Sequence, residues 1–138
     1  MSILLNNVKF SYSNSCQESG INIENWSIAA GEKQFIYGPS GCGKSTLLNL
    51  ISGMLCPKAG SISVLGEQLE TMNNQQRNKF RANNIGYIFQ QFNLINYLSA
   101  FENITLANQF LIKKNTTNLK QKILCLLESL DIKSEHWD

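Results

Sequence analysis

A single short motif constrains this chain more than any other feature of its sequence. Residues 38–46 match the pattern G-x-x-x-x-G-K-[ST] and run Gly38, Pro39, Ser40, Gly41, Cys42, Gly43, Lys44, Ser45 and Thr46. Successive backbone N–H groups of such a glycine-rich turn point inward and form a concavity for anions, and a following helix adds the positive end of its dipole. The motif therefore predicts that these residues bind the phosphates of a nucleoside triphosphate.

The side chains of this loop suit a triphosphate that carries magnesium. We expect Lys44 to reach the β- and γ-phosphate oxygens as a point charge, and the Ser45 hydroxyl to take one place in the octahedral shell of Mg²⁺. The backbone N–H of Cys42 is expected to face the nucleotide, with its thiol a small side chain at a variable position. ATP and Mg²⁺ are thus the predicted ligands.

The segments on either side of the loop have the order that the motif requires. Phe35, Ile36 and Tyr37 form a short apolar run, which predicts a strand buried on both faces. After the loop, apolar residues recur at helical spacing and Gly53 is placed to end the helix. These helical positions are Leu47, Leu50, Ile51 and Met54. Strand, loop and helix in this order predict an α/β fold.

Short strands are also predicted before and after this central unit. Residues 3–12 alternate in polarity, and residues 21–28 give a second strand with a slip of phase that we interpret as a bulge. We expect these two strands to be antiparallel, with a turn over residues 11–20 between them. Ile62 and Val64 alternate with serines, which predicts a short, half-buried strand.

Helices and one further core strand are expected in the second half of the chain. A helix is predicted from Asn73 or Asn74 through Arg81, and the β-prone residues 85–89 predict a strand that delivers Gln90 at its end. Ser99 and Glu102 match a capping box, so a helix should run from about residue 99 towards 111. An amphipathic helix is predicted over about residues 118–130.

Composition narrows the class of protein. The 138 residues have the length of one domain, and 12 basic against 10 acidic residues without charge runs give no indication of a nucleic-acid partner. The chain opens without a basic segment followed by a long apolar one, so a cytosolic location is expected. Residues 82–101 carry no charge, but six side-chain amides interrupt them, and a membrane span is not predicted.

The cysteines and the single histidine show no metal-binding pattern. Cys16, Cys42, Cys56 and Cys125 lack C-x-x-C spacing, and His136 does not complete a recognisable zinc site with them. We interpret the cysteines as free thiols in a reducing compartment and the histidine as a surface residue.

Two stretches of the sequence resemble the ATP-binding subunits of ABC transporters. Residues 38–48 are similar to the family's phosphate loop nearly residue for residue, and residues 85–94 resemble its glutamine-loop segment. Residues 90–95, 97–99 and 102–104 are most similar to the lipoprotein-releasing and macrolide-exporter type, although Asn96 stands where these relatives often have proline.

The resemblance implies roles for two residues outside the loop. Tyr12 falls where the family places an aromatic that stacks on adenine, an interaction open to any base because every base has a π-face. Gln90 would contact Mg²⁺ or the attacking water, which makes Lys44 and Gln90 the expected catalytic residues and Ser45 and Gln90 the expected metal ligands. The implied partners are a transmembrane permease subunit and a second ATP-binding subunit, at the cytoplasmic face of the membrane.

The resemblance also implies a domain that stops early. The expected fold is a P-loop NTPase core with N-terminal antiparallel strands over residues 1–91 and part of a helical subdomain over residues 92–138. The family's Leu-Ser-Gly-Gly-Gln signature, its strand ending in Asp-Glu and its switch histidine do not occur in the 138 residues. We therefore expect the isolated chain to hydrolyse ATP very slowly or not at all.

Two alternatives to an exporter subunit remain open at this point. One is a non-catalytic nucleotide-binding module that needs a second polypeptide. The other is a different P-loop enzyme, such as a small kinase or a GTPase. A GTPase would be expected to contain the guanine-binding sequence Asn-Lys-x-Asp, which this chain lacks.

Overall fold

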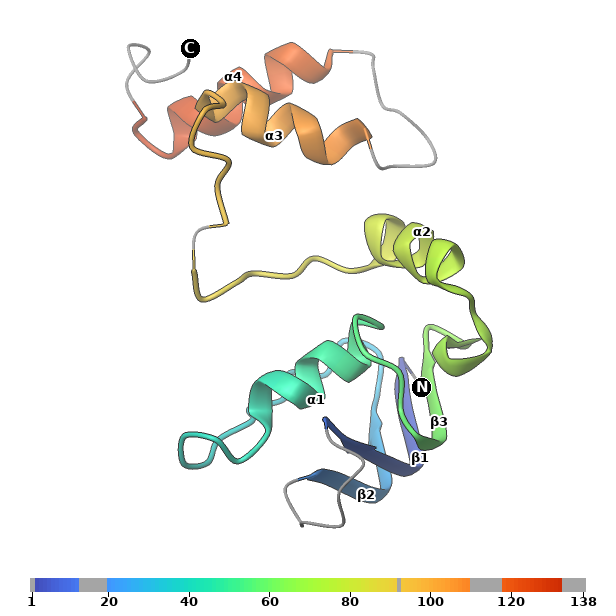
Figure 1. Cartoon of the computed structure of the whole chain (residues 1–138). Coiled ribbons are helices and arrows are strands. Elements are labelled where there is room, and N and C mark those ends of the chain that lie inside the picture. The colour runs from blue at the N-terminus through green and yellow to red at the C-terminus, as the bar shows by residue number, and fades with distance from the viewer. Residues whose placement is uncertain (1, 13–19, 92, 110–117, 133–138) are drawn as a thin grey trace. The chain divides into compact units, whose positions relative to one another are not determined.

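The computed structural model describes residues 2–12, 20–91, 93–109 and 118–132. The chain forms two compact units, Met1–Arg81 and Ala82–Asp138, which are described separately below. Figure 1 colours the chain from blue at the N-terminus to red at the C-terminus, as its bar shows by residue number. The elements are β1 (Ile3–Ser11), β2 (Gly20–Ile28), α1 (Lys44–Ile51), β3 (Ala59–Val64), β4 (Glu67–Gln68), the 3-10 helix η1 (Leu69–Thr71), α2 (Asn74–Asn84), α3 (Ala100–Gln109) and α4 (Leu119–Ser129).

The first unit is built on an antiparallel sheet with strand order β2-β1-β3-β4. β1 and β2 pair from Ile3 opposite Ile28 to Ser11 opposite Gly20, which confirms the predicted antiparallel pair. The predicted bulge in the second strand is corrected, because the register of β2 against β1 is unbroken. The irregularity lies instead in β1, between Asn6 and Lys9, where its pairing with β3 shifts.

This bulge in β1 depends on a glycine in the neighbouring strand. Asn7 has a φ of 49° and Gly60 a φ of 83°, both in the left-handed region. A Cβ on Gly60 would lie 2.2 Å from the carbonyl oxygen of Asn7 and 2.4 Å from that of Asn6. Since real Cβ atoms do not approach backbone so closely, only glycine lets β3 lie against the bulge.

The hydrophobic core of the first unit lies between the sheet and the helices that follow it. Figure 1 shows α1 lying against one face of the sheet. The predicted half-buried strand is confirmed as β3, in which Ile62 and Val64 are buried. The other buried apolar residues of this unit are Leu5, Val8, Leu50, Leu69 and Phe80. Burying a side chain of this size contributes about 1.5–3 kcal/mol, so this small cluster stabilises the first unit.

α1 ends and α2 begins where the sequence predicts, but α2 continues to Asn84, three residues beyond the predicted end at Arg81. α1 ends at Ile51, two residues before Gly53, whose φ is 70°. Asn73 caps α2, since its side-chain oxygen accepts the backbone N–H of Gln76 at 2.9 Å while the Gln76 amide oxygen accepts the N–H of Asn73 at 2.8 Å. Arg81 donates to the carbonyl of Gly53 at 2.9 Å, which ties α2 to the end of α1.

Both predicted core strands around the functional motifs are wrong. Residues 35–37 and 85–89 form no strand in the structure. Phe35 and Tyr37 are 91% and 92% exposed, and Ile88 is 97% exposed, rather than buried. A strand needs a neighbour to accept and donate its backbone hydrogen bonds, and no strand of the described residues pairs with either segment.

The described residues of the second unit include α3, α4 and the last three residues of α2. The predicted capping box is confirmed, because Glu102 N–H donates to Ser99 Oγ at 3.1 Å and Ser99 N–H donates to Glu102 Oε2 at 2.9 Å at the start of α3. Asn103 holds the turn that precedes it, through its amide oxygen on the N–H of Ile95 and its amide N–H groups on the carbonyls of Ile95, Leu98 and Ser99. The turn at Asn96 therefore forms without the proline that relatives often have.

The predicted amphipathic helix is confirmed as α4. It buries Ile123 and Leu127 and exposes Leu126. Several predictions fall on residues that the structure does not describe. They concern the end of the preceding helix near residue 111, residues 13–19 of the first turn with Cys16, and His136. No helix in the described part of the chain is both long and apolar enough to cross a lipid bilayer.

Candidate nucleotide-binding site

The glycine-rich loop has a backbone that only glycine adopts easily. Gly41 and Gly43 have φ values of 80° and 99°, and Gly43 occupies the N-cap position of α1. A non-glycine residue in this left-handed region is strained. The first intrahelical hydrogen bond of α1 runs from Leu47 N–H to the Gly43 carbonyl at 2.8 Å. The loop therefore turns directly into the helix, as the motif predicts.

The N-terminus of α1 is suited to an anion. No side chain caps it, and its first turn contains no acidic residue. The first N–H groups of a helix have no intrahelical partner and carry the positive end of the dipole. A phosphate group placed here would accept hydrogen bonds from the backbone and would complement the dipole of α1.

Lys44 folds back into the loop. Its ammonium group donates to the carbonyl oxygens of Gly38 at 2.8 Å and Pro39 at 2.7 Å, and it lies 3.6 Å from the sulfur of Cys42. Neutral acceptors of the loop therefore hold the charge of this ammonium group in place. Phosphate oxygens are stronger acceptors for an ammonium donor than carbonyl oxygen or thiol sulfur, so a bound triphosphate would compete well for these hydrogen bonds.

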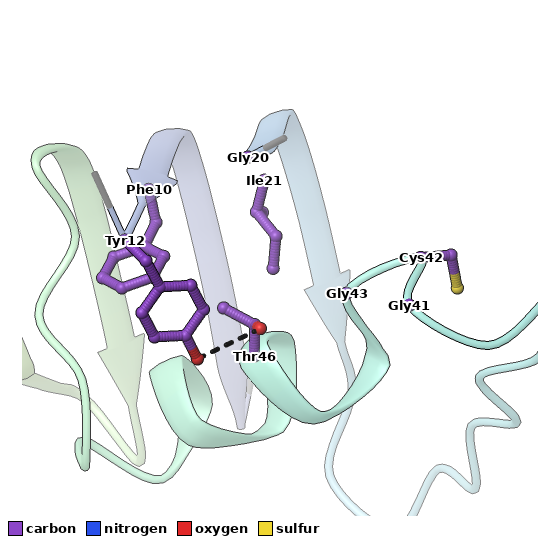
Figure 2. A pocket seen from close by; sticks show the side chains of 8 residues that line it. All are labelled: Phe10, Tyr12, Gly20, Ile21, Gly41, Cys42, Gly43 and Thr46. Carbon is purple, nitrogen blue, oxygen red and sulfur yellow. Dashed lines mark hydrogen bonds between the residues drawn. The ribbon is translucent and has the colours of Figure 1, made fainter. Parts of the chain in front are cut away.

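A pocket of about 380 Å³ lies between the loop and the sheet. Figure 2 shows side chains from β1, β2, the loop and α1 around it. Its lining consists of Phe10, Tyr12, Gly20, Ile21, Gly41, Cys42, Gly43 and Thr46. The pocket thus joins an apolar and aromatic wall to the glycine-rich turn, which is the combination that a base with attached phosphates requires.

Tyr12 stands at the border of this pocket, immediately after β1. The residue is 72% exposed, and its ring meets the ring of Phe10 edge to face, with centroids 5.0 Å apart. Its hydroxyl lies 3.3 Å from the hydroxyl of Thr46 on α1. The structure therefore brings Tyr12 and Thr46 together, and the exposed ring is accessible to a stacking partner.

Cys42 lies over the start of the loop. A Cβ on Gly38 would come within 2.8 Å of its sulfur, so the thiol occupies the space that a side chain at Gly38 would need. Cys42, Cys56 and Cys125 are free thiols, as predicted. The described residues contain no group of three or more histidine, cysteine or acidic side chains that could hold a metal ion.

The predicted magnesium ligands lie in different units. Ser45 is exposed in the first turn of α1, and Gln90 is exposed in the second unit, beyond α2. A hydroxyl and an amide oxygen are ligands of the type that Mg²⁺ takes, and this ion usually keeps several waters and binds substrate phosphates rather than a full cage of protein ligands. Each of the two side chains by itself is therefore of a type that suits Mg²⁺, and their joint role stays a prediction.

Phe10, Gly20 and Ile21 belong to the pocket lining but were not among the predicted site residues. The structure requires glycine at position 20, because a Cβ there would lie 2.5 Å from the carbonyl oxygen of Phe10. The period-two pattern of β1 placed Phe10 and Tyr12 on one face, and this was the sequence feature that could have linked them.

The fold and the loop together define the class of P-loop NTPases, and comparisons with known proteins narrow it. A family profile described as ABC transporter matches residues 21–137. The lipoprotein-releasing system ATP-binding protein LolD of Xanthomonas oryzae is 39% identical over 106 residues, which are 77% of this chain and 43% of LolD. A putative ABC transporter ATP-binding protein of Mycoplasma pneumoniae is 52% identical over 69 residues, half of this chain and 15% of that protein.

Solved structures agree with these sequence relatives. The ATP-binding cassette MJ0796, in a dimeric post-hydrolysis state bound to ADP and Pi, superposes with a TM-score of 0.82 at 30% identity. The superposition covers 98% of this chain and 60% of the cassette. The chain belongs to the ABC transporter family and corresponds to the N-terminal portion of its ATP-binding subunit. It spans less than half the length of the curated relatives reported above.

Proposed function

We propose that this chain is the nucleotide-binding portion of an ATP-binding subunit in an ABC exporter. Its ligand is ATP with Mg²⁺, and its site consists of the loop residues 38–46 together with Tyr12. The observation that carries the proposal is the position of the Lys44 ammonium, 2.7–2.8 Å from the carbonyls of Gly38 and Pro39 beside an uncapped helix N-terminus.

Each residue of the site binds a different part of the nucleotide. Backbone N–H groups of the loop and of α1 bind the phosphates, and Lys44 exchanges its carbonyl acceptors for phosphate oxygens. Tyr12 stacks on adenine, Ser45 provides a hydroxyl ligand for Mg²⁺, and Gln90 contacts the metal or the attacking water. The bound Mg²⁺ would neutralise charge on the β- and γ-phosphates during transfer.

We infer the role of the whole protein from the relatives to which it is similar. LolD by name serves a lipoprotein-releasing system, and the MJ0796 cassette is dimeric in its solved form. We propose a second ATP-binding subunit and a transmembrane permease as partners, a place at the cytoplasmic face of the membrane, and an exported substrate that is lipid-linked or hydrophobic. Residues 1–91 would bind the nucleotide, and residues 92–138 would form part of a helical subdomain.

Binding of ATP and Mg²⁺ by the 138-residue chain, measured by isothermal titration calorimetry, tests this proposal directly. Lys44→Ala removes a charged donor, and since a hydrogen bond to a charged group contributes about 1.5–3 kcal/mol, we expect affinity to fall at least roughly tenfold. Lys33→Ala is the matched control, because Lys33 is an exposed lysine of the same unit outside the loop. Equal ATP affinities of the two variants would contradict the proposed site.

A second candidate function is a binding module that works only with another polypeptide. The nearly complete exposure of Phe35 and Tyr37, directly before the loop, favours it, because apolar side chains in this position are normally covered. Turnover of ATP by the chain alone tests the second candidate. We expect the chain alone to bind ATP with little or no hydrolysis, and turnover equal to that of a full-length subunit without an added polypeptide would contradict the second candidate.

A further inference from the structure

We propose that Phe10 and Thr46 are positioning residues that hold Tyr12 as a preformed platform for the nucleotide base. The inference rests on the proposed function, since it assumes that the pocket beside the loop takes the base of a nucleotide. It adds Phe10, and a role for the Thr46 hydroxyl, that the phosphate-loop motif does not supply.

Two contacts fix the Tyr12 side chain from different elements. The Phe10 ring, two residues earlier on β1, meets it at an interplanar angle of 87° with centroids 5.0 Å apart. The Thr46 hydroxyl, on the third residue of α1, lies 3.3 Å from the Tyr12 hydroxyl. Figure 2 shows the Tyr12 ring beside Phe10 with its hydroxyl directed towards Thr46. An edge-to-face pair and a hydrogen bond together restrict both side-chain torsions of a tyrosine.

The backbone under Tyr12 is also tied down. Lys58 donates from its ammonium group to Ser11 Oγ at 3.0 Å and from its backbone N–H to the Lys9 carbonyl at 2.8 Å. The last residues of β1 are thus fastened to the segment that leads into β3. A ring on a residue that is 72% exposed would otherwise move freely, so its order comes from this backbone and from its two side-chain contacts.

A fixed platform favours binding because less side-chain freedom is lost when the base stacks. Ordering one free side chain at an interface costs an amount equivalent to a roughly two- to tenfold change in affinity. Thr46 can also serve both ends of the ligand, since a hydroxyl donates one hydrogen bond and accepts two. It can accept from Tyr12 while it donates to a phosphate oxygen, which would couple the base platform to the phosphate loop.

The test compares affinity for ATP with affinity for inorganic tripolyphosphate, both with Mg²⁺ and the full chain. Phe10→Leu should weaken ATP binding roughly two- to tenfold and leave tripolyphosphate binding unchanged. In a Tyr12→Leu background the same substitution should cause no further loss, because Phe10 then has no ring to position. Phe35→Leu is the matched control and should change neither affinity.

Tyr12→Phe tests the hydroxyl contact without altering the loop. It should weaken ATP binding while leaving tripolyphosphate binding unchanged, because it removes only the hydroxyl that contacts Thr46. Tyr97→Phe is the control for Tyr12→Phe, because it removes an exposed tyrosine hydroxyl in the second unit. The folding of every variant is checked by its thermal unfolding midpoint.

The outcomes separate this inference from the function beneath it. The positioning role would be overturned if Phe10→Leu weakened the binding of ATP and of tripolyphosphate equally. It would also be overturned if Phe10→Leu kept its full effect in the Tyr12→Leu background. In both cases the proposal of nucleotide binding would still stand. If the wild-type chain bound neither ligand, both the proposed function and this inference would fail.

Discussion

The sheet of the first unit and the segment that leads from it into the phosphate loop are both apolar, but their side chains are covered very differently. Leu5 on β1 and Ile62 on β3 are fully buried, whereas Phe35 and Tyr37 are more than nine-tenths exposed. The strands of the sheet find partners within the first 68 residues, and the segment finds none among the described residues. Apolar composition alone therefore does not make a strand, because a strand also needs a partner.

This difference bears on how the site is held. The C-terminal half of the glycine-rich loop continues into α1, whose Leu50 is buried in the core. The N-terminal half follows an unpaired segment and is held by hydrogen bonds from Lys44 to Gly38 and Pro39. The lysine that would bind phosphate is thus also a support of the free loop, so nucleotide binding and loop order should change together.

Removing a core side chain from the sheet should have the largest effect on stability. Leu5→Ala takes a fully buried leucine out of β1, and such substitutions cost about 2–5 kcal/mol because they remove apolar contacts and leave a cavity. Urea unfolding of the variant and of wild type measures this difference. An unchanged free energy of unfolding would mean that the sheet is not the stabilising core of the first unit.

Gly60→Ala should be the next most damaging change. Its φ of 83° would strain alanine by about 1–3 kcal/mol, and the added Cβ would also overlap the carbonyls at the β1 bulge. Gly66→Ala is the matched control, since its φ is 86° but no atom lies within 4 Å of its Cβ position. Thermal unfolding of the two variants separates strain from overlap, and equal losses would show that the close approach of β3 to Asn7 costs nothing.

Loss of the capping box should have a smaller effect, confined to the second unit. Ser99→Ala leaves the Glu102 N–H without its side-chain acceptor at the start of α3, which should cost about 1 kcal/mol. Ser99→Thr keeps a capping oxygen and serves as the control. Hydrogen exchange of the amides in the first turn of α3 reports the change locally, and equal exchange in both variants would count against the cap.

Local interactions explain which parts of the fold could be predicted from the sequence. The capping box at Ser99, the cap at Asn73 and the turn of the phosphate loop each depend on residues within a few positions, and each was confirmed. The strands over residues 35–37 and 85–89 were wrong because strand formation depends on partners far away in the sequence. The bulge was assigned to the wrong strand for the same reason, since its position depends on how β3 pairs with β1.

The site also has a part that the sequence predicts and a part that it does not. The nine residues of the loop follow from a contiguous motif, and the backbone at Gly41 and Gly43 has the required geometry. The Tyr12–Thr46 hydrogen bond joins residues that are 34 positions apart, whereas the Phe10 ring contacts a residue only two positions further along the chain. The hydrogen bond depends on how the end of β1 lies against α1, which no local pattern contains. The roles of Ser45 and Gln90 towards Mg²⁺ stay predictions.

The smallest effect on stability should come from the exposed segment before the loop. Phe35→Ser and Tyr37→Ser remove apolar side chains that contribute little burial, so the free energy of unfolding of each variant should stay within about 0.5 kcal/mol of wild type. Each should also reduce self-association, measured by sedimentation velocity, since exposed apolar patches promote it. A loss of stability comparable to that of Leu5→Ala would mean that the segment is covered in solution by another strand or molecule, and the contrast between the two regions would then disappear.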